Sequence, residues 1–296
     1  MPVVHLIDAP VYVFRAYHSL PELRAPDGTP TGAAYGFANT LVKWLGEARP
    51  SHVAVTFDFS SESFRNEIEP EYKAQRGEVP DDLAPQFELC AELCHALGLP
   101  VFEREGYEAD DLIATLAARL AGRAACVVVS SDKDLAQLVR EDGSVVLFDL
   151  ARGVSRDADG VRQKFGVDPA QIPDWLGLVG DAVDNLPGVP GVGPVGASAA
   201  LRAFGRIEEI PADPAAWQAL RIRGAGRLAA LIDAHRERAL RTRELATLVR
   251  DVPGLRADLG RLRWRGARRG ELEDLFGRLG WGRIAERVPQ WAPERG

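Results

Sequence analysis

The sequence predicts an α/β fold in which helices cover both faces of a mainly parallel sheet, followed by a helical region. Over the first 150 residues, short apolar runs alternate with segments of helical spacing, as expected for strands joined by helical crossovers. The runs are apolar almost throughout, which favours strands buried on both faces over a half-exposed antiparallel sheet. From about residue 160 the pattern becomes helical, with short segments between turns rich in glycine and proline.

The spacing of apolar residues predicts the individual elements. We expect strands over residues 3–8, 52–58, 126–132 and 145–150. We expect helices over residues 35–47, 82–98 and 109–121, and shorter ones at 162–165, 173–180 and 198–204. The first helix is predicted by an apolar face of Phe37, Leu41, Trp44 and Leu45, and Gly98 is a helix stop signal. Segment 184–196 has the highest density of turn residues.

Composition excludes several classes of protein. Hydrophobic residues make up 46% of the 296 residues, but no run reaches 18 apolar residues, so we expect no membrane span. The N-terminus has no signal-peptide pattern, and we therefore expect a cytoplasmic protein. Three cysteines give no disulfide framework, and Cys90 and Cys94 lie on an apolar helical stripe without the further ligands of a zinc site.

The charge is distributed unevenly along the chain. The net charge is −7, but residues 1–200 carry −14 and residues 201–296 carry +7. An acidic part beside a basic part is expected when one holds cations and the other contacts phosphates. An uneven but merely solvated surface is the alternative explanation.

Aspartates end three of the predicted strands: Asp8, Asp58 and Asp132. In a parallel sheet these residues meet at the carboxyl edge, where open α/β sheets bind ligands. Carboxylates that converge repel one another unless cations neutralise them. One such aspartate is often only a helix cap, but three together indicate a cation site.

Six further acids follow in short clusters at a helix start, at a strand-to-helix junction and before the turn-rich segment. They are Glu108, Asp110, Asp111, Asp134, Asp181 and Asp184. Each of the first two clusters alone is more often explained by helix capping. With the strand-end aspartates they make nine carboxylates without histidine or cysteine, a set suited to Mg²⁺ or Mn²⁺. Nine acids exceed the needs of one Mg²⁺, and two ions suit the displacement of a phosphodiester.

Loop GVPGVG, residues 188–193, predicts a contact with nucleic acid. It lies between two short predicted helices and resembles a helix-hairpin-helix, whose backbone amides can hold a DNA phosphate. The predicted DNA contacts in this loop are Gly188, Gly191 and Gly193.

A basic and aromatic stretch predicts further phosphate contacts. Arg65, Lys73 and Arg76 can bind phosphates, and Tyr72 can stack on an unpaired base. The arginine-rich segment 261–269 either extends these contacts or forms the polar face of a terminal helix pair. For isolated basic residues in a loop, simple solvation is the usual explanation.

Taken together, these residues resemble the 5′ nuclease domain of bacterial DNA polymerase I and the stand-alone 5′–3′ exonucleases and flap endonucleases related to it. The similarity extends over nearly the whole chain. Six segments carry it: LIDAPVYVFRAYHSLP (6–21), TFDFSSESFRNE (56–67), YKAQRGEVPDDL (72–83), GYEADDLIATLA (106–117), SSDKDLAQLV (130–139) and GDAVDNLPGVPGVG (180–193).

The resemblance implies both architecture and activity. A PIN-like (Rossmann-like) core is implied over residues 1–160, with a helical arch at about 65–85, and a helix-hairpin-helix (H3TH) and C-terminal helical region over 161–296. The implied activity is hydrolysis of DNA at 5′ flaps or 5′ ends by a two-metal mechanism, in replication or repair. No polymerase domain follows in the sequence, so we expect a free-standing nuclease that acts as a monomer.

The resemblance also implies roles for individual residues. The first metal would be held by Asp8, Asp58, Glu108, Asp110 and Asp111, and the second by Asp132, Asp134, Asp181 and Asp184. The basic residues that would steer the scissile phosphate are Arg15, Lys73 and Arg76. Tyr72 would lie near the 5′ end, and the hairpin loop would bind K⁺ through backbone carbonyls.

One position departs from the family pattern. Val195 stands where the relatives usually have lysine, which predicts weaker and less salt-dependent duplex binding.

Two other functions are alternatives to a DNA-cutting nuclease. An RNA-cutting nuclease of the PIN class shares the strand-end acids, but the hairpin loop and the C-terminal region argue against it. A catalytically inactive DNA-structure-binding protein would be favoured by loss of acids, and none is lost.

Overall fold

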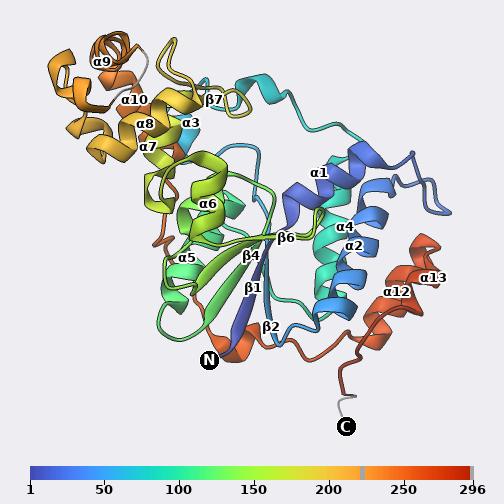
Figure 1. The fold of residues 1–296 in the computed structure, drawn as a ribbon. Helices are drawn as coiled ribbons and strands as arrows, with labels where there is room; N and C mark the ends of the chain where they lie inside the picture. Colours follow the sequence, from blue (N-terminus) through green and yellow to red (C-terminus); the bar gives the residue numbers. More distant parts are fainter. Residues whose placement is uncertain (221–223, 294–296) are drawn as a thin grey trace.

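A computed structural model describes residues 1–220 and 224–293. Six strands form one sheet in the order β3-β2-β1-β4-β5-β6, in which β6 runs antiparallel to β5 and the other neighbours run parallel (Figure 1). The strands are β1 (Val3–Asp8), β2 (His52–Thr56), β3 (Val101–Phe102), β4 (Ala125–Val129), β5 (Val145–Asp149) and β6 (Val154–Arg156). The mainly parallel sheet predicted from the sequence is confirmed.

The predicted strand ends differ from the observed ones in a way that matters for function. β2 ends at Thr56 and β4 ends at Val129, so Asp58 and Asp132 lie in the loops that follow these strands. The antiparallel edge strand β6 and helix α1 (Ala9–Ser19) were not predicted. Helix α1 begins directly after Asp8, because Pro10 is well placed in the first turn of a helix.

Alternate side chains of the central strands enter two separate cores. Ile7, Val53 and Val55 point toward α1, α2 (Gly32–Ala48) and α4 (Ala84–Ala96). Leu6 and Ala54 point to the opposite face, which is covered by α5 (Ala109–Leu120) and α6 (Ala158–Phe165). Burial on both faces explains why these strands are apolar at most positions.

A helical region follows the sheet. Its elements are η3 (Pro169–Gln171), α7 (Ile172–Val179), β7 (Gly180–Asp181), β8 (Leu186–Pro187), α8 (Pro194–Phe204), η4 (Ile207–Glu209), η5 (Pro214–Leu220), α9 (Ala225–Ala234) and α10 (Arg236–Ala246). Helices α7 and α10 pack against each other, and the antiparallel β7–β8 ribbon lies between α7 and the glycine-rich loop. Within the described residues, no helix combines the length and the apolar character needed to cross a bilayer.

The segment between β2 and α4 is only partly helical. It contains α3 (Phe64–Ile68) and the 3₁₀ turn η1 (Ala74–Arg76), joined by turns. The segment runs from the edge of the sheet to the helical region and back toward α4 (Figure 1). A helical arch at about 65–85 stays a prediction, as does a domain boundary at residue 160.

The end of the chain returns to the sheet. After α11 (Leu259–Leu262), the backbone N–H of Trp264 donates to the carbonyl oxygen of Ser51 over 2.9 Å, and its indole N–H donates to that of Leu97. Helices α12 (Arg269–Leu279) and α13 (Gly282–Ala285) then pack against α4 and α2. The predicted C-terminal helical region therefore contributes to both halves of the molecule.

Gly98 offers a test of this return. A Cβ at Gly98 would lie 2.3 Å from the carbonyl oxygen of Gly266, whereas a Cβ at Gly122 would meet nothing, and both glycines have φ of +72°. Both alanine variants carry the left-handed backbone strain, so their difference isolates the contact with the C-terminal segment. We expect Gly98→Ala to lower the free energy of unfolding by about 2 kcal/mol more than Gly122→Ala, as measured by urea denaturation. Equal losses would contradict the close contact.

Candidate active site

The carboxyl ends of three neighbouring strands bring aspartates to one edge of the sheet. Asp8 is the last residue of β1, Asp58 follows the end of β2, and Asp132 follows the end of β4. These strands are adjacent and parallel, so the segments that leave them emerge side by side. The connections from β1 and β4 lead to opposite faces, and such a switch point is where open α/β sheets hold ligands.

The start of α5 adds Glu108 and Asp110 to this edge. Glu108 is the N-cap residue of α5, and the following backbone N–H, of Ala109, donates to Asp58 Oδ1 over 2.7 Å. The backbone dipoles of a helix start stabilise negative charge. This local effect offsets part of the repulsion between the acids.

Two more segments complete the set. η2 (Asp134–Leu138) begins with Asp134, and the β7–β8 ribbon carries Asp181 and Asp184. The backbone N–H of Asp134 donates to Asp132 Oδ1 over 2.9 Å, which fixes the loop after β4. We define the acid cluster as eight carboxylates: Asp8, Asp58, Glu108, Asp110, Asp132, Asp134, Asp181 and Asp184.

Burial and repulsion raise pKa values within the acid cluster. The pKa of Asp8 rises from 3.8 to about 7, chiefly because burial disfavours its charged form. The hydrogen bond from Ser130 lowers this pKa, whereas the negative charges of Asp132 and Asp58 raise it further. Burial, followed by the charge of Asp8, raises the pKa of Asp110 well above its usual range. Burial, followed by Asp132, does the same for Asp134. A set of carboxyls with such values is stabilised by cations.

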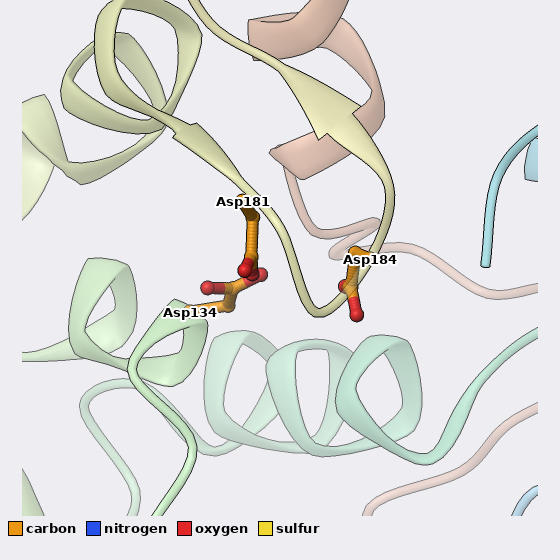
Figure 2. A group of neighbouring side chains, drawn as sticks. All are labelled: Asp134, Asp181 and Asp184. Carbon is orange, nitrogen blue, oxygen red and sulfur yellow. The ribbon is translucent and has the colours of Figure 1, made fainter. Parts of the chain in front are cut away.

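Three members of the acid cluster are arranged to hold a metal ion. Asp134, Asp181 and Asp184 each offer a carboxylate oxygen, and these oxygens lie within 4.8 Å of one another (Figure 2). Asp134 Oδ1 is buried and has no hydrogen-bond partner among the described residues, and Lys133 Nζ lies 3.9 Å from it. A buried oxygen without a donor is costly, and a cation would satisfy it. An all-oxygen donor set fits a hard divalent ion such as Mg²⁺ or Mn²⁺.

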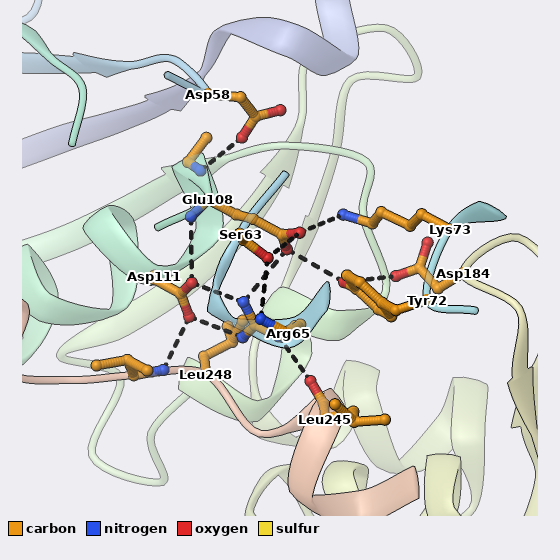
Figure 3. A network of polar contacts seen from close by, with 12 residues as sticks. Asp58, Ser63, Arg65, Tyr72, Lys73, Glu108, Asp111, Asp184, Leu245 and Leu248 are labelled. Atoms are coloured by element: carbon orange, nitrogen blue, oxygen red, sulfur yellow. Dashed lines mark hydrogen bonds and ion pairs between the residues drawn. The ribbon is translucent and has the colours of Figure 1, made fainter. Parts of the chain in front are cut away.

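Basic side chains already contact the acid cluster. Lys73 Nζ lies 2.9 Å from Glu108 Oε1 (Figure 3), and Arg76 pairs with Asp184. Burial alone would raise the pKa of Glu108, but Lys73 and Arg65 outweigh it and hold that pKa below its usual value. The predicted phosphate-steering residues Lys73 and Arg76 therefore lie beside the acids, within reach of a phosphate held there.

The segment that carries these cations is docked on the β7–β8 loop. The backbone N–H of Lys73 donates to the carbonyl oxygen of Asp184 over 3.0 Å, and Asn185 Nδ2 donates to that of Glu71 over 2.6 Å. Lys73 and Asn185 both adopt positive φ, of 58° and 55°. Left-handed backbone at two non-glycine residues costs energy and is often found at functional sites.

Tyr72 is buried beneath this segment. Its side chain is 3% exposed, and its hydroxyl lies 3.2 Å from Glu108 Oε2 and 3.4 Å from Asp184 Oδ2. The ring therefore braces the two carboxylates in this conformation. Stacking of Tyr72 on an unpaired base stays a prediction, and it requires the segment to move.

Asp111 and Arg65 depart from the predicted roles. Asp111 points away from the acid cluster and forms a bidentate ion pair with Arg65, and both side chains are buried (Figure 3). A buried arginine that is paired in this way does not face solvent or DNA. The geometry supports neither a DNA contact of Arg65 nor metal ligation by Asp111.

The remaining predicted residues lie at the periphery. Arg15 is exposed on α1, and within the described part of the chain its side chain has no hydrogen bond to the acids. Gly188 is required for packing, since a Cβ there would lie 2.3 Å from the carbonyl carbon of Val179. Gly191 and Gly193 are exposed, and Val195 is 86% exposed at the start of α8. Their contacts with DNA stay predictions.

Comparison with known proteins is consistent with this site. Residues 3–166 match the family model of the 5′–3′ exonuclease N-terminal resolvase-like domain, and residues 167–269 match the 5′–3′ exonuclease C-terminal SAM fold. The chain belongs to the 5′–3′ exonuclease family. The resemblance noted from the sequence is thereby confirmed.

The relatives of this chain include both 5′–3′ exonucleases and DNA polymerases I. The 5′–3′ exonuclease of Aquifex aeolicus is 39% identical over 211 residues, which are 71% of this chain and 72% of that protein. DNA polymerase I of Pseudomonas aeruginosa is 45% identical over 249 residues, which are 83% of this chain. The aligned part is 27% of that polymerase, so the chain spans about a quarter of the length of this curated relative.

Solved structures share the fold at low identity. The bacteriophage T5 5′-exonuclease with bound divalent metal ions (zinc) has a TM-score of 0.68 at 20% identity, over 94% of this chain and 99% of that one. The catalytic core of Rad2 in complex with DNA substrate has a TM-score of 0.62 at 16% identity, over 97% and 91%. These likenesses show that the α/β sheet and helical region are a shared architecture.

Two residues beside the acid cluster were not predicted. Ser130 Oγ donates to Asp8 Oδ2 over 2.6 Å, and Lys133 pairs with Asp181. Both lie in the motif that carries Asp132 and Asp134, but only Lys133 lies between these two acids. Neither a serine nor a lysine at a strand end is informative by itself, because partners from β1 and β7 come from distant parts of the chain.

The raised pKa of Asp8 predicts how stability depends on pH without metal. The folded pKa is about 7 and the unfolded value is 3.8, so the folded state binds more protons between these values. Stability therefore falls as pH rises through this window, by about 4 kcal/mol for this group.

Asp8→Asn removes this titration. In EDTA, we expect the variant to gain stability relative to the wild type between pH 5 and pH 8 in urea denaturation. Asp142→Asn is the control, because Asp142 is exposed and bonded locally to Ser144. Parallel pH profiles for wild type and Asp8→Asn would show that Asp8 titrates normally.

Proposed function

We propose that this chain is a structure-selective, metal-dependent 5′–3′ DNA exonuclease and 5′ flap endonuclease that hydrolyses phosphodiester bonds. The observation that carries the proposal is the acid cluster at the sheet switch point, in which Asp134, Asp181 and Asp184 each offer a carboxylate oxygen within 4.8 Å of the others. Membership of the 5′–3′ exonuclease family supports the reaction class and the substrate.

Two Mg²⁺ ions, for which Mn²⁺ can substitute, fit the acids present. Asp134, Asp181 and Asp184 would hold one ion together with Asp132, and Asp8, Asp58, Glu108 and Asp110 would hold the other. When bound, these ions supply charge neutralisation at the phosphodiester and a water that is acidic enough to attack at neutral pH. A K⁺ ion at the hairpin loop, held by backbone carbonyls, remains part of the proposal.

The chain's own residues position the DNA. The hairpin loop with Gly191 and Gly193 would hold a duplex phosphate through backbone amides. Lys73 and Arg76 are poised beside the acids, so each can exchange a carboxylate partner for a non-bridging phosphate oxygen. Hydrolysis breaks the bond from phosphorus to the 3′ oxygen, which leaves a 3′-hydroxyl on the released piece and a 5′-phosphate on the remainder.

Several finer expectations stay predictions. They are the preference for 5′ flaps over 5′ ends, the monomeric state, the cytoplasmic location and a role in replication or repair. The predicted effect of Val195 also stands: its exposed aliphatic side chain offers no charge to a phosphate.

A single cleavage experiment tests the proposal. A 5′-labelled flap on a nicked duplex is incubated with wild type in Mg²⁺, with wild type in EDTA, and with Asp110→Asn in Mg²⁺. We expect cleavage near the flap junction only for wild type with Mg²⁺. Asp159→Asn is the matched control, because this exposed acid pairs only with Arg162 on α6 among the contacts described. Intact binding without cleavage under every condition would favour the inactive DNA-structure-binding alternative.

Lys73 offers a sharper test of the positioning. If Lys73 stabilises charge that develops on the phosphate, Lys73→Met should lower kcat by about 100-fold with little change in flap binding. Lys43→Met is the control, since Lys43 is an exposed cation that pairs with Glu47 on α2. Cleavage by Lys73→Met at the wild-type rate would contradict the role.

A further inference from the structure

Every N–H group of the Arg65 guanidinium has an acceptor. Arg65 is 1% exposed, and its two terminal nitrogens donate to Asp111 Oδ2 over 2.7 Å and Oδ1 over 2.8 Å. Nη1 also donates to Glu108 Oε2 over 3.3 Å, and Nη2 to the carbonyl oxygen of Thr247 over 3.3 Å. Nε donates to the carbonyl oxygen of Leu245 over 2.7 Å. The five donors of an arginine are thus all used, and none remains for a phosphate.

Asp111 is equally saturated. Besides the two bonds from Arg65, Oδ2 accepts from the backbone N–H of Glu108 over 3.3 Å, and Oδ1 from that of Val249 over 2.9 Å. A carboxylate has about four acceptor sites, and Asp111 fills them with four bonds while being completely buried. No lone pair of Asp111 is left for a metal ion.

The Arg65–Asp111 pair joins three parts of the molecule. Arg65 belongs to α3, and Asp111 lies in the first turn of α5. The carbonyl groups of Leu245 and Thr247 lie at the end of α10. The pair therefore ties the helical region and the segment after β2 to the helix start from which Glu108 and Asp110 extend into the acid cluster.

We propose that Arg65 and Asp111 are a buried positioning pair that holds Glu108 and Asp110 in a metal-binding arrangement and itself contacts neither metal nor DNA. This inference rests on the proposed function only for the identity of the metal. Loss of the pair frees the first turn of α5, and the affinity for metal falls although every metal-facing carboxylate is still present.

The experiment compares Arg65→Lys, Asp111→Asn and the double variant. Lysine keeps the charge of Arg65 but cannot form the two parallel bonds. Arg243→Lys is the matched control, because Arg243 forms a half-buried pair with Asp174 and does not contact the acid cluster among the contacts described. Three quantities are measured: the Mg²⁺ dependence of the melting temperature, the Mg²⁺ concentration for half-maximal flap cleavage, and the salt dependence of flap binding in EDTA.

Each single variant is expected to need about 10- to 100-fold more Mg²⁺ in both metal titrations, as is typical when a partner of a metal-holding side chain is lost. The double variant should need no more than the worse single one, because the two residues act through each other. The salt dependence of binding should stay unchanged. Arg243→Lys should lower the melting temperature without changing the Mg²⁺ requirement.

Three results would overturn the inference. A salt dependence reduced by about one phosphate contact in a variant with Arg65→Met and Asp111→Leu, which removes the charge of Arg65, would identify a DNA contact. Additive losses of metal affinity in the double variant would identify Asp111 as an independent ligand. An unchanged Mg²⁺ requirement would assign the pair to stability alone.

Two features keep the test decisive. If a single variant does not fold, Arg65→Met with Asp111→Leu removes both charges without leaving one buried alone, and the same increase in the Mg²⁺ requirement is expected. If the wild type cleaves no DNA, the proposed function fails, while the Mg²⁺ dependence of the melting temperature still decides whether the pair positions a metal site.

Discussion

Repulsion among buried carboxylates is the constraint on which this structure depends. Eight acids share one edge of the sheet, and burial together with neighbouring charges raises the pKa values of Asp8, Asp110 and Asp134. Such a set is stable only if hydrogen bonds and cations oppose the repulsion. The helix start of α5, Ser130 and three basic side chains supply part of that opposition, whereas Asp134 Oδ1 receives no hydrogen bond within the described residues.

The same requirement explains why distant segments are joined so closely around the site. The turn that carries Lys73 and Arg76 is bonded to the β7–β8 loop through backbone groups of Lys73 and Asp184. Arg65 connects α5 to the end of α10 through buried bonds. The helical region therefore completes the acid cluster and positions it. A sheet alone would bring together only the strand-end aspartates and those of α5 and η2.

This arrangement also gives the uneven charge of the chain a physical meaning. Residues 1–200 contain all the carboxylates of the acid cluster, whereas residues 201–296 carry a net charge of +7. In the proposed function, the acids hold cations and the basic part favours the phosphate backbone beside them. Not every basic residue serves that purpose, however, because Arg65 is buried and neutralises Asp111 inside the protein.

The sequence by itself determined the mainly parallel sheet, the aspartates at the carboxyl ends of its strands, and membership of the family. These could be read because hydrophobic periodicity and motif order are local properties of the chain. It did not reveal the antiparallel β6, the return of α11–α13 to the sheet, or which acids face the site. Asp110 and Asp111 are adjacent and chemically identical in the sequence, yet only the tertiary structure directs one into the acid cluster and the other onto Arg65. That difference depends on the direction of each side chain from the first turn of α5 and on partners more than 40 residues away, which no local pattern encodes.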